Sequence, residues 1–258
     1  MTDSSVDLGS ADPGEGSSAI DPDWTLGRLV TERPSAARVL ERHGLDYCCG
    51  GARTLSEAAA EQGVDLAGLA EELGRLEPEP EPDWARMSPS ELARHVVEVH
   101  HRYLRSELPR LSSLAEKVAG VHGALHPELH ELRRAFERLR ADLLPHLVKE
   151  ERMLFPAIEE LEGADDHVPW FPFGSPSGPI SVLLAEHDTA GELLERMREL
   201  SDDYRVPEGG CASYRALFHG LEELERDLHL HVHKENNVLF PAVARLERRL
   251  SAGTPTPG

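Results

Sequence analysis

The chain has 258 residues, of which 40% are hydrophobic, 29% charged and only 5% aromatic, and its formal net charge is −20. This excess of negative charge disfavours nucleic acid or an anionic membrane as a partner, because both are negatively charged themselves. The first residues show no signal peptide, no run reaches the roughly 18 apolar residues of a membrane span, and three cysteines, two of them adjacent, do not make a disulfide framework. We therefore expect a soluble cytoplasmic protein.

The sequence predicts an all-α protein, because few windows alternate apolar and polar residues as strands do. We divide the chain into five parts. Residues 1–22 form an acidic leader with too little apolar surface to fold. Residues 23–76 form a small helical domain, and residues 77–87 form a linker that alternating Pro and Glu keep extended. Residues 88–251 form a four-helix bundle, and residues 252–258 are a tail.

Capping residues mark the helix starts of the small domain. Thr25 and Asp65 can each cap a helix, and Thr54 with Glu57 has the pattern of a capping box. A domain of about 50 residues is marginal on its own. We therefore expect it to lean on the rest of the chain or to form a homodimer.

A further capping-box pattern begins the bundle, and four amphipathic helical patterns follow it. These patterns cover residues 89–119, 127–161, 180–200 and 209–250. Four such helices joined by modest loops make a four-helix bundle. Pro109 and Pro145 fall inside two of them and are expected to kink the helices.

The strongest chemical signal is a repeated segment in the second and fourth helices. The segment from His146 to Ile158 is written again from His231 to Val243, with H-x-x-x-E at the start and Leu-Phe-Pro-Ala later in each copy. Residues four apart share one face of a helix. Each copy therefore points an imidazole and a carboxylate at the same neighbour.

The other two helices each place one histidine on an apolar stripe, His101 on the first and His187 on the third. Any single buried histidine is more often a hydrogen-bonded core residue than a ligand. Four imidazoles and two carboxylates buried together without a metal would cost several kcal/mol for each unpaired charge. The set therefore favours a metal site, whose mixed nitrogen and oxygen ligands suit iron and are also compatible with zinc or manganese.

Cys48 and Cys49 are the second chemical feature, placed between helices and followed by two glycines. Adjacent cysteines bond to each other only with strain, so a structural disulfide is not expected. We expect both thiols to be exposed enough to react, so that they could form mixed disulfides or bind iron. The alternative is that two small residues simply fill a helix junction. We assign Cys211 no role.

Several of these motifs resemble one family. Residues 46–51, with the sequence DYCCGG, resemble the signature of the small N-terminal domain of bacterial di-iron proteins that repair iron–sulfur clusters, the repair-of-iron-centres family. Residues 146–156, 186–194 and 235–241 resemble the hemerythrin-like domain of that family. The resemblance covers roughly residues 24–250.

The resemblance implies a hemerythrin-like four-helix bundle with two non-haem iron ions, bridged by oxide and by carboxylates. Glu150 and Glu235 would be the bridging residues. The six implied ligands, which the spacing also indicates as a set, are His101, His146, Glu150, His187, His231 and Glu235.

The resemblance also implies a function, the repair of iron–sulfur clusters damaged by nitric oxide or oxidative stress, by delivery of iron. Damaged iron–sulfur proteins would be the partners, and nitric oxide or oxygen the small ligand. One alternative is an oxidoreductase that reduces nitric oxide at the same centre, so the sequence leaves enzymatic turnover open. Another alternative is a hemerythrin-like module that binds or senses oxygen or nitric oxide.

Overall fold

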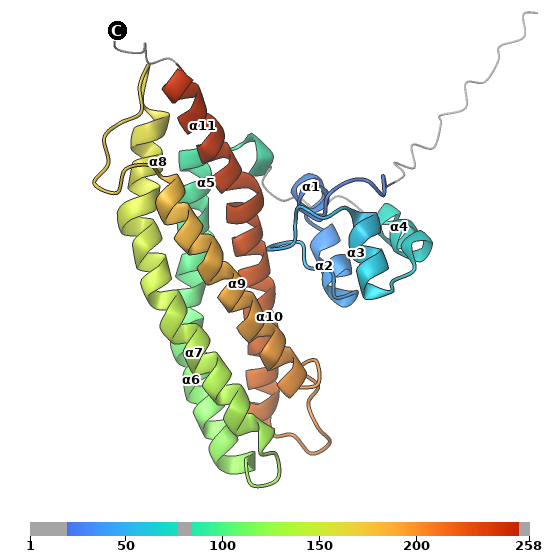
Figure 1. Cartoon of the computed structure of the whole chain (residues 1–258). Coiled ribbons are helices and arrows are strands. Elements are labelled where there is room, and N and C mark those ends of the chain that lie inside the picture. Colours follow the sequence, from blue (N-terminus) through green and yellow to red (C-terminus); the bar gives the residue numbers. More distant parts are fainter. Residues whose placement is uncertain (1–19, 77–83, 253–258) are drawn as a thin grey trace, which may run out of the picture.

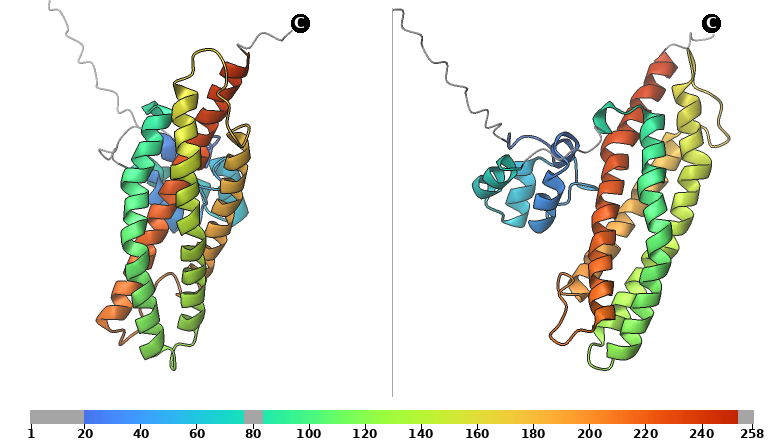
Figure 2. Two further views of the ribbon diagram at one scale, coloured as in Figure 1. Left: turned by 90° about the vertical axis from the view of Figure 1, so that its left-hand side faces the viewer. Right: turned by 180° about the vertical axis from the view of Figure 1, so that it is seen from behind.

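The computed structural model describes residues 20–76 and 84–252, and all named elements in this part of the chain are helices. Four long helical columns stand side by side as a bundle, and a small helical unit lies against one side of it (Figures 1 and 2). The predicted all-α class is confirmed, with a small N-terminal unit followed by the bundle.

The small unit begins its helices where the capping residues predict. Its helices are α1 (Leu26–Glu32), α2 (Ala36–Arg42), α3 (Leu55–Gln62) and α4 (Leu66–Gly74). Thr25 accepts a hydrogen bond from the backbone N–H of Arg28, and Thr54 forms both halves of its capping box. These side chains satisfy backbone donors that a helix leaves open at its first turn.

The four columns of the bundle are built from helices joined end to end. The first column comprises α5 (Pro89–Val96), η2 (Val97–His101) and α6 (Arg102–His122), and the second comprises α7 (Glu128–Lys149), η3 (Glu150–Leu154) and α8 (Phe155–Glu162). The third column is α9 (Ser177–Leu200), and the fourth comprises α10 (Ala212–His233), η4 (Lys234–Leu239) and α11 (Phe240–Ala252). Pro109 and Pro145 lie inside α6 and α7 without ending either helix.

The small unit shares a hydrophobic core with the bundle. Leu29 and Leu40 of the small unit belong to the same cluster of buried residues as Leu92, Ile158 and Val243 of the bundle. The loop between α2 and α3 reaches the fourth column at η4 (Figure 1). The small unit therefore leans on the rest of the chain, as its size leads one to expect.

The predicted linker is only partly open to description, because residues 77–83 lie outside the described residues. Its last part is not extended: Trp84–Arg86 forms the short helix η1, and Trp84 is almost fully buried. The Nζ of Lys234 lies 4.2 Å from the centroid of the Trp84 ring, so a cation–π contact adds to the burial of the indole. The division into domains stays a prediction. Residues 1–19 of the leader and 253–258 of the tail lie outside the described residues, whereas Ile20 is buried in the core and Ala252 ends α11.

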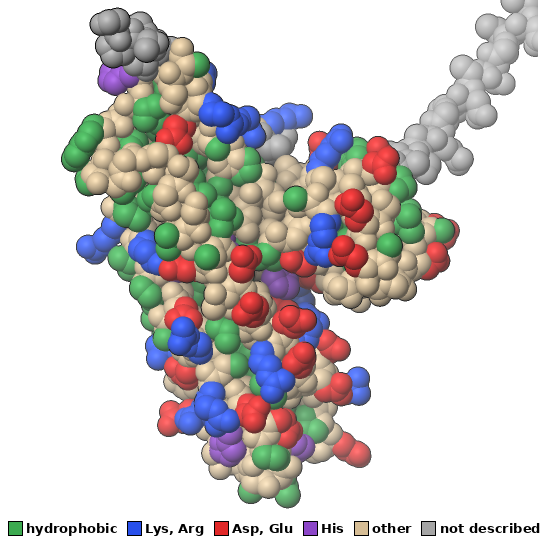
Figure 3. Space-filling model, in the orientation of Figure 1, with side chains coloured by type: hydrophobic (Ala, Val, Ile, Leu, Met, Phe, Trp, Pro, Cys, Tyr) green, Lys and Arg blue, Asp and Glu red, His purple; other side chains and the backbone are tan. Residues whose placement is uncertain are grey.

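The surface mixes both signs of charge despite the net charge of −20. On the lower part of the bundle, acidic and basic side chains lie interspersed over the face that Figure 3 shows. Several form pairs along one helix, such as Arg138 with Asp142. Among the described residues, no helix combines the length and the apolar character needed to cross a membrane.

Candidate metal centre

Six buried polar side chains meet inside the bundle, and every column contributes at least one of them. None exposes more than 2% of its surface. The six are the predicted ligands, namely His101 of η2, His146 of α7, Glu150 of η3, His187 of α9, His231 of α10 and Glu235 of η4. The structure thus brings together all the residues that the repeat and the apolar stripes indicated.

The six side chains divide into two overlapping groups of four. One group joins His101 and His231 with both glutamates, and the other joins His146 and His187 with the same two glutamates. Within each group the candidate ligand atoms all lie within 4.8 Å of one another. Two cations placed in these groups would each meet two imidazoles and would share both carboxylates.

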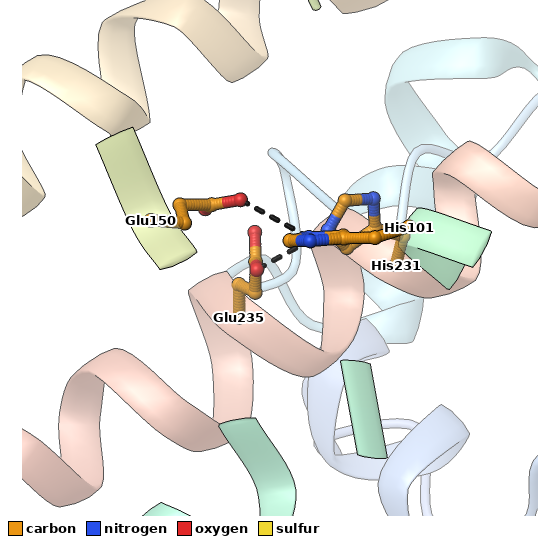
Figure 4. A group of neighbouring side chains, drawn as sticks. All are labelled: His101, Glu150, His231 and Glu235. Carbon is orange, nitrogen blue, oxygen red and sulfur yellow. Dashed lines mark hydrogen bonds and ion pairs between the residues drawn. The ribbon is translucent and has the colours of Figure 1, made fainter. Parts of the chain in front are cut away.

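Each glutamate turns one oxygen toward each group. Glu150 Oε2 lies 3.3 Å from Nε2 of His101, whereas its Oε1 lies 3.2 Å from Nε2 of His146. Glu235 does the same, with each of its oxygens 3.2 Å from an imidazole nitrogen of a different group. In Figure 4 the two carboxylates point toward the imidazoles of the first group. Such an orientation suits carboxylates that bridge two ions.

Several of these atoms lack the partners that buried polar atoms require. Both oxygens of Glu150, one oxygen of Glu235 and Nε2 of His101 are fully buried without a hydrogen-bond partner in the described part of the chain. Leaving such a group unsatisfied costs about 1–3 kcal/mol, and more when it is charged. A metal cation would satisfy these atoms together, so the donor set fits a metal.

The pKa values show how the cluster compensates for its burial. Burial alone would raise the pKa of Glu235, but the nearby His231 and His187 hold it well below its usual range. Burial lowers the pKa of His146, yet Glu150 more than offsets this and raises it to about 9. The pKa of His101 is also raised, because Glu150 outweighs the effect of burial. Without a metal, the imidazole of His146 is therefore protonated at neutral pH, next to the buried carboxylate of Glu150.

Three of the columns interrupt their α-helical geometry at this level. The segments η2, η3 and η4 are π-helical turns, and they contain His101, Glu150 and Glu235. Such wider turns occur frequently at functional sites. The sequence patterns predict helix here but contain no signal for the change of pitch.

Three of the four histidines are oriented by a partner on their outward-facing nitrogen. The Nδ1–H of His101 donates to Glu151 at 2.7 Å, and that of His146 donates to Glu186 at 2.9 Å. A third outer bond, from His187 to Asn236, spans 2.8 Å. These bonds fix the tautomer that leaves Nε2 free to face the centre, and such partners also raise the basicity of a ligand.

The carboxylate outside His146 is charged at neutral pH. Burial alone would raise the pKa of Glu186, but hydrogen bonds from Lys149 and His146 lower it. Neither Glu186 nor its counterpart Glu151 was predicted from the sequence. Each of them is adjacent in sequence to a predicted ligand of a neighbouring column, and this is the signal that could have identified both.

Replacing Glu186 by Ala is expected to weaken one of the two metal sites. Outer partners of this kind typically change metal affinity by about 10–100-fold, and only the group with His146 and His187 loses one. An anaerobic iron(II) titration should therefore show one binding step weakened and the other retained. Glu195→Ala, at an exposed position of the same helix, is the control. Two steps of unchanged affinity in Glu186→Ala would contradict this assignment.

His100 is buried beside the centre, although the sequence predicted no role for it. Its ring stacks on His231 at 5.3 Å. Lys234 donates to Nε2 of His100 at 2.9 Å. The proton of the His100 ring is therefore on Nδ1, which donates to Asp227 at 2.8 Å. Burial raises the pKa of Asp227 to about 7. Asp227 lies one helical turn before His231, where the same four-residue spacing could have identified it.

The two adjacent cysteines lie in the loop that reaches η4, and only one has the exposure that the sequence predicts. Cys48 is buried with 7% exposure, whereas Cys49 is half-buried. The Cys48 thiol donates to the Asp46 carboxylate at 3.1 Å. A hydrogen bond with Cys49 and burial raise the pKa of Cys48 well above its usual range. The expectation of two exposed thiols is therefore wrong for Cys48, because this side chain packs into the shared core.

A helical bundle with two overlapping His and Glu groups in its interior is the arrangement of a hemerythrin-like, cation-binding protein. The family model of the Hemerythrin HHE cation binding domain matches residues 92–243. A second family model, a Domain of Unknown function (DUF542), matches residues 22–77.

Similar proteins of known name cover nearly the whole chain. The chain is 41% identical over 221 residues to the iron–sulfur cluster repair protein YtfE of Edwardsiella ictaluri (strain 93-146). This match covers 85% of this chain and 96% of the relative. It is 36% identical over 225 residues to the protein of the same name from Yersinia pseudotuberculosis serotype IB (strain PB1/+), covering 86% of this chain and 97% of the relative. The chain belongs to this family of iron–sulfur cluster repair proteins.

Proposed function

We propose that this protein carries two iron ions and uses them to repair iron–sulfur clusters damaged by nitric oxide or oxidants, by delivering iron to the damaged cluster. The observation that supports this best is the pair of His groups sharing Glu150 and Glu235. The relatives' name, iron–sulfur cluster repair protein, supports the nature of the client.

The proposed ligands are the six buried side chains described above, with Glu150 and Glu235 shared between the ions. Bound iron would supply redox chemistry and open positions for a small ligand such as nitric oxide or oxygen. The chain holds the imidazoles in place by their outer hydrogen bonds. Phe155 stacks on His101 at 5.9 Å and Phe240 on His187 at 6.1 Å, and these rings help to exclude water.

The half-buried Cys49 is the proposed contact for the client, with Cys48 behind it. The two sulfurs lie 4.0 Å apart as free thiols. Reduced thiols fit the proposed cytoplasmic location, because disulfides rarely persist there. From this loop the chain could exchange thiols with a client or pass iron to it.

Metal analysis of anaerobically purified protein is the first test, combined with absorption spectra before and after exposure to air. We expect about two iron ions per chain, since four nitrogen and oxygen donors surround each position. Bands of an oxo-bridged ferric pair should appear in air and bleach with reductant. A folded sample supplied with iron that takes up none would refute the proposal.

Replacing both cysteines by Ser is expected to separate metal binding from repair. In Cys48→Ser/Cys49→Ser the iron content should stay that of the native chain, because neither thiol belongs to the two His and Glu groups. Repair of a client cluster damaged by nitric oxide should be lost if the thiols contact the client, because serine cannot replace a reactive thiolate. Retained repair would rule out the role of the thiols but not the iron centre.

Reduction of nitric oxide is a second candidate, favoured by the near-equivalence of the two metal groups. Two ferrous ions side by side could supply two electrons, so that two molecules of nitric oxide and two protons yield nitrous oxide and water. An anaerobic assay of the reduced protein for nitrous oxide distinguishes this activity from iron delivery. Repair of a client without nitrous oxide would leave the first proposal alone.

A further inference from the structure

Two adjacent asparagines connect the metal centre with the cysteine loop. Asn236 and Asn237 follow the proposed ligand Glu235 in the π-helical turn η4. Neither is fully buried. Both amides hydrogen bond to the backbone around Cys48, but only one of them also contacts a proposed metal ligand.

Asn237 fastens the loop to the bundle. Its amide nitrogen donates to the carbonyl oxygens of Cys48 at 3.0 Å and Tyr47 at 3.3 Å. The amide fits against two glycines: a Cβ added to Gly51 would lie 2.3 Å from the Asn237 oxygen, and one added to Gly27 would lie 2.6 Å from it. The loop at Gly51 and helix α1 at Gly27 approach the Asn237 side chain this closely because neither residue carries a Cβ.

The side-chain amide of Asn236 contacts both a proposed metal ligand and the cysteine loop. Its Oδ1 accepts the Nδ1–H of His187 at 2.8 Å, and its Nδ2 donates to the carbonyl oxygen of Cys48 at 3.4 Å. The opposite nitrogen of His187 faces the centre, 3.2 Å from Glu235. One unbroken path of three side chains and a carbonyl therefore runs from the proposed bridging carboxylate to Cys48.

We propose that Asn236 couples metal occupancy to the conformation of the Cys48–Cys49 loop, an inference that rests on the proposed metal centre. A cation at Nε2 draws electron density from the imidazole, so the Nδ1–H of His187 becomes a stronger donor. Hydrogen bonds in a chain polarise one another, so the Asn236 amide then donates more strongly to Cys48. The loop is held closed while metal is bound and loosens once it leaves. The thiols would thus become accessible when iron has been released.

The structure makes opening of the loop necessary before Cys48 can react. Its side chain is 7% exposed and its thiol donates to Asp46. Asn237 also holds the loop against the bundle, but none of its described hydrogen bonds reaches one of the six proposed ligands. The role of Asn236 therefore predicts that the accessibility of Cys48 and Cys49 depends on bound metal, whereas Asn237 keeps the loop attached to the bundle in either state.

The test measures alkylation of the thiols in iron-loaded and metal-free protein, under anaerobic conditions. Trypsin cleaves after Arg42 and Arg53, so Cys48 and Cys49 lie on one peptide and Cys211 on another, and mass spectrometry can follow each. Cys211 is exposed and lies beside His122 at the start of α10, which makes it an internal control. We expect iron to slow alkylation of Cys48 and Cys49 by about fivefold or more, a usual size for coupling between sites, and to leave Cys211 unaffected.

Asn236→Asp separates the two ends of the path. The carboxylate still accepts from His187, so iron should be retained, but its second oxygen meets the Cys48 carbonyl instead of donating to it. The iron-dependent difference in alkylation should then shrink to less than about twofold. A full difference in this variant would overturn the inference, as would iron-loaded native protein that alkylates at the metal-free rate.

Reciprocity provides a second measurement that needs no variant. If metal closes the loop, and the loop opens and closes faster than the reagent reacts, native protein alkylated at Cys48 and Cys49 must bind iron more weakly by the same factor. Equal affinity of the alkylated and unmodified chains would overturn the coupling even if Asn236→Asp failed to fold. Absence of any iron binding in the native chain would instead refute the proposed metal centre, and this inference with it. The iron analysis distinguishes the two failures.

Discussion

Glu235→Gln is expected to abolish the binding of both metal ions, not just one. Glu235 is fully buried and belongs to both His and Glu groups, one oxygen facing each. An amide in its place keeps the shape, removes the negative charge and presents an NH2 group to one of the groups. Outer partners alone change metal affinity by about 10–100-fold, so loss of a shared ligand should lower it by more than about 100-fold at both positions.

Anaerobic iron(II) titration measures this effect, and Glu225→Gln is the matched control. Glu225 is also a buried carboxylate of the fourth column, but it pairs with Arg198 and lies outside both groups. The control should retain two binding steps even if it lowers the stability of the fold. One normal binding step remaining in Glu235→Gln would contradict a shared role for this residue and would leave it as a ligand of a single ion.

Metal affinity is expected to rise steeply with pH between about 6.5 and 9. The pKa of His146 in the metal-free protein is about 9, compared with about 6.5 for an ordinary histidine. Its imidazole is therefore protonated at pH 7 and must lose that proton to bind a metal. The metal affinity of the group that contains His146 and His187 should increase about tenfold for each pH unit over this interval. The pKa of His101 is also raised, so the metal affinity of the group that contains His101 and His231 should increase with pH as well.

The same shift affects the metal-free fold with the opposite sign. The folded-state pKa of His146 lies above its unfolded value, so its contribution to stability is fully present below about pH 6.5 and is lost as pH rises through about 9. Calorimetric titration with Co2+ in two buffers of different ionisation enthalpy counts the protons released. We expect the ion that binds at His146 to release about one proton at pH 7. Binding without proton release would refute the raised pKa values.

The sequence alone determined the helical architecture and the identity of the clustered residues. Caps such as Thr25 and Thr54 act through neighbours two or three positions away, so they can be recognised without knowing the fold. A four-residue spacing likewise places His146 and Glu150 on one helical face wherever that helix goes. Burial of one apolar stripe in each column then carries all six polar side chains inward.

Only the tertiary structure decided how those residues pair and what surrounds them. The pairing of His101 with His231, and the direction of each carboxylate oxygen, depend on how four columns are rotated against each other. The burial of Cys48 and the reach of Asn236 depend on two parts of the chain that are far apart in sequence. Helical periodicity fixes the face on which a side chain lies, because it is a local property. Its partners are fixed by packing between distant segments, which no local pattern records.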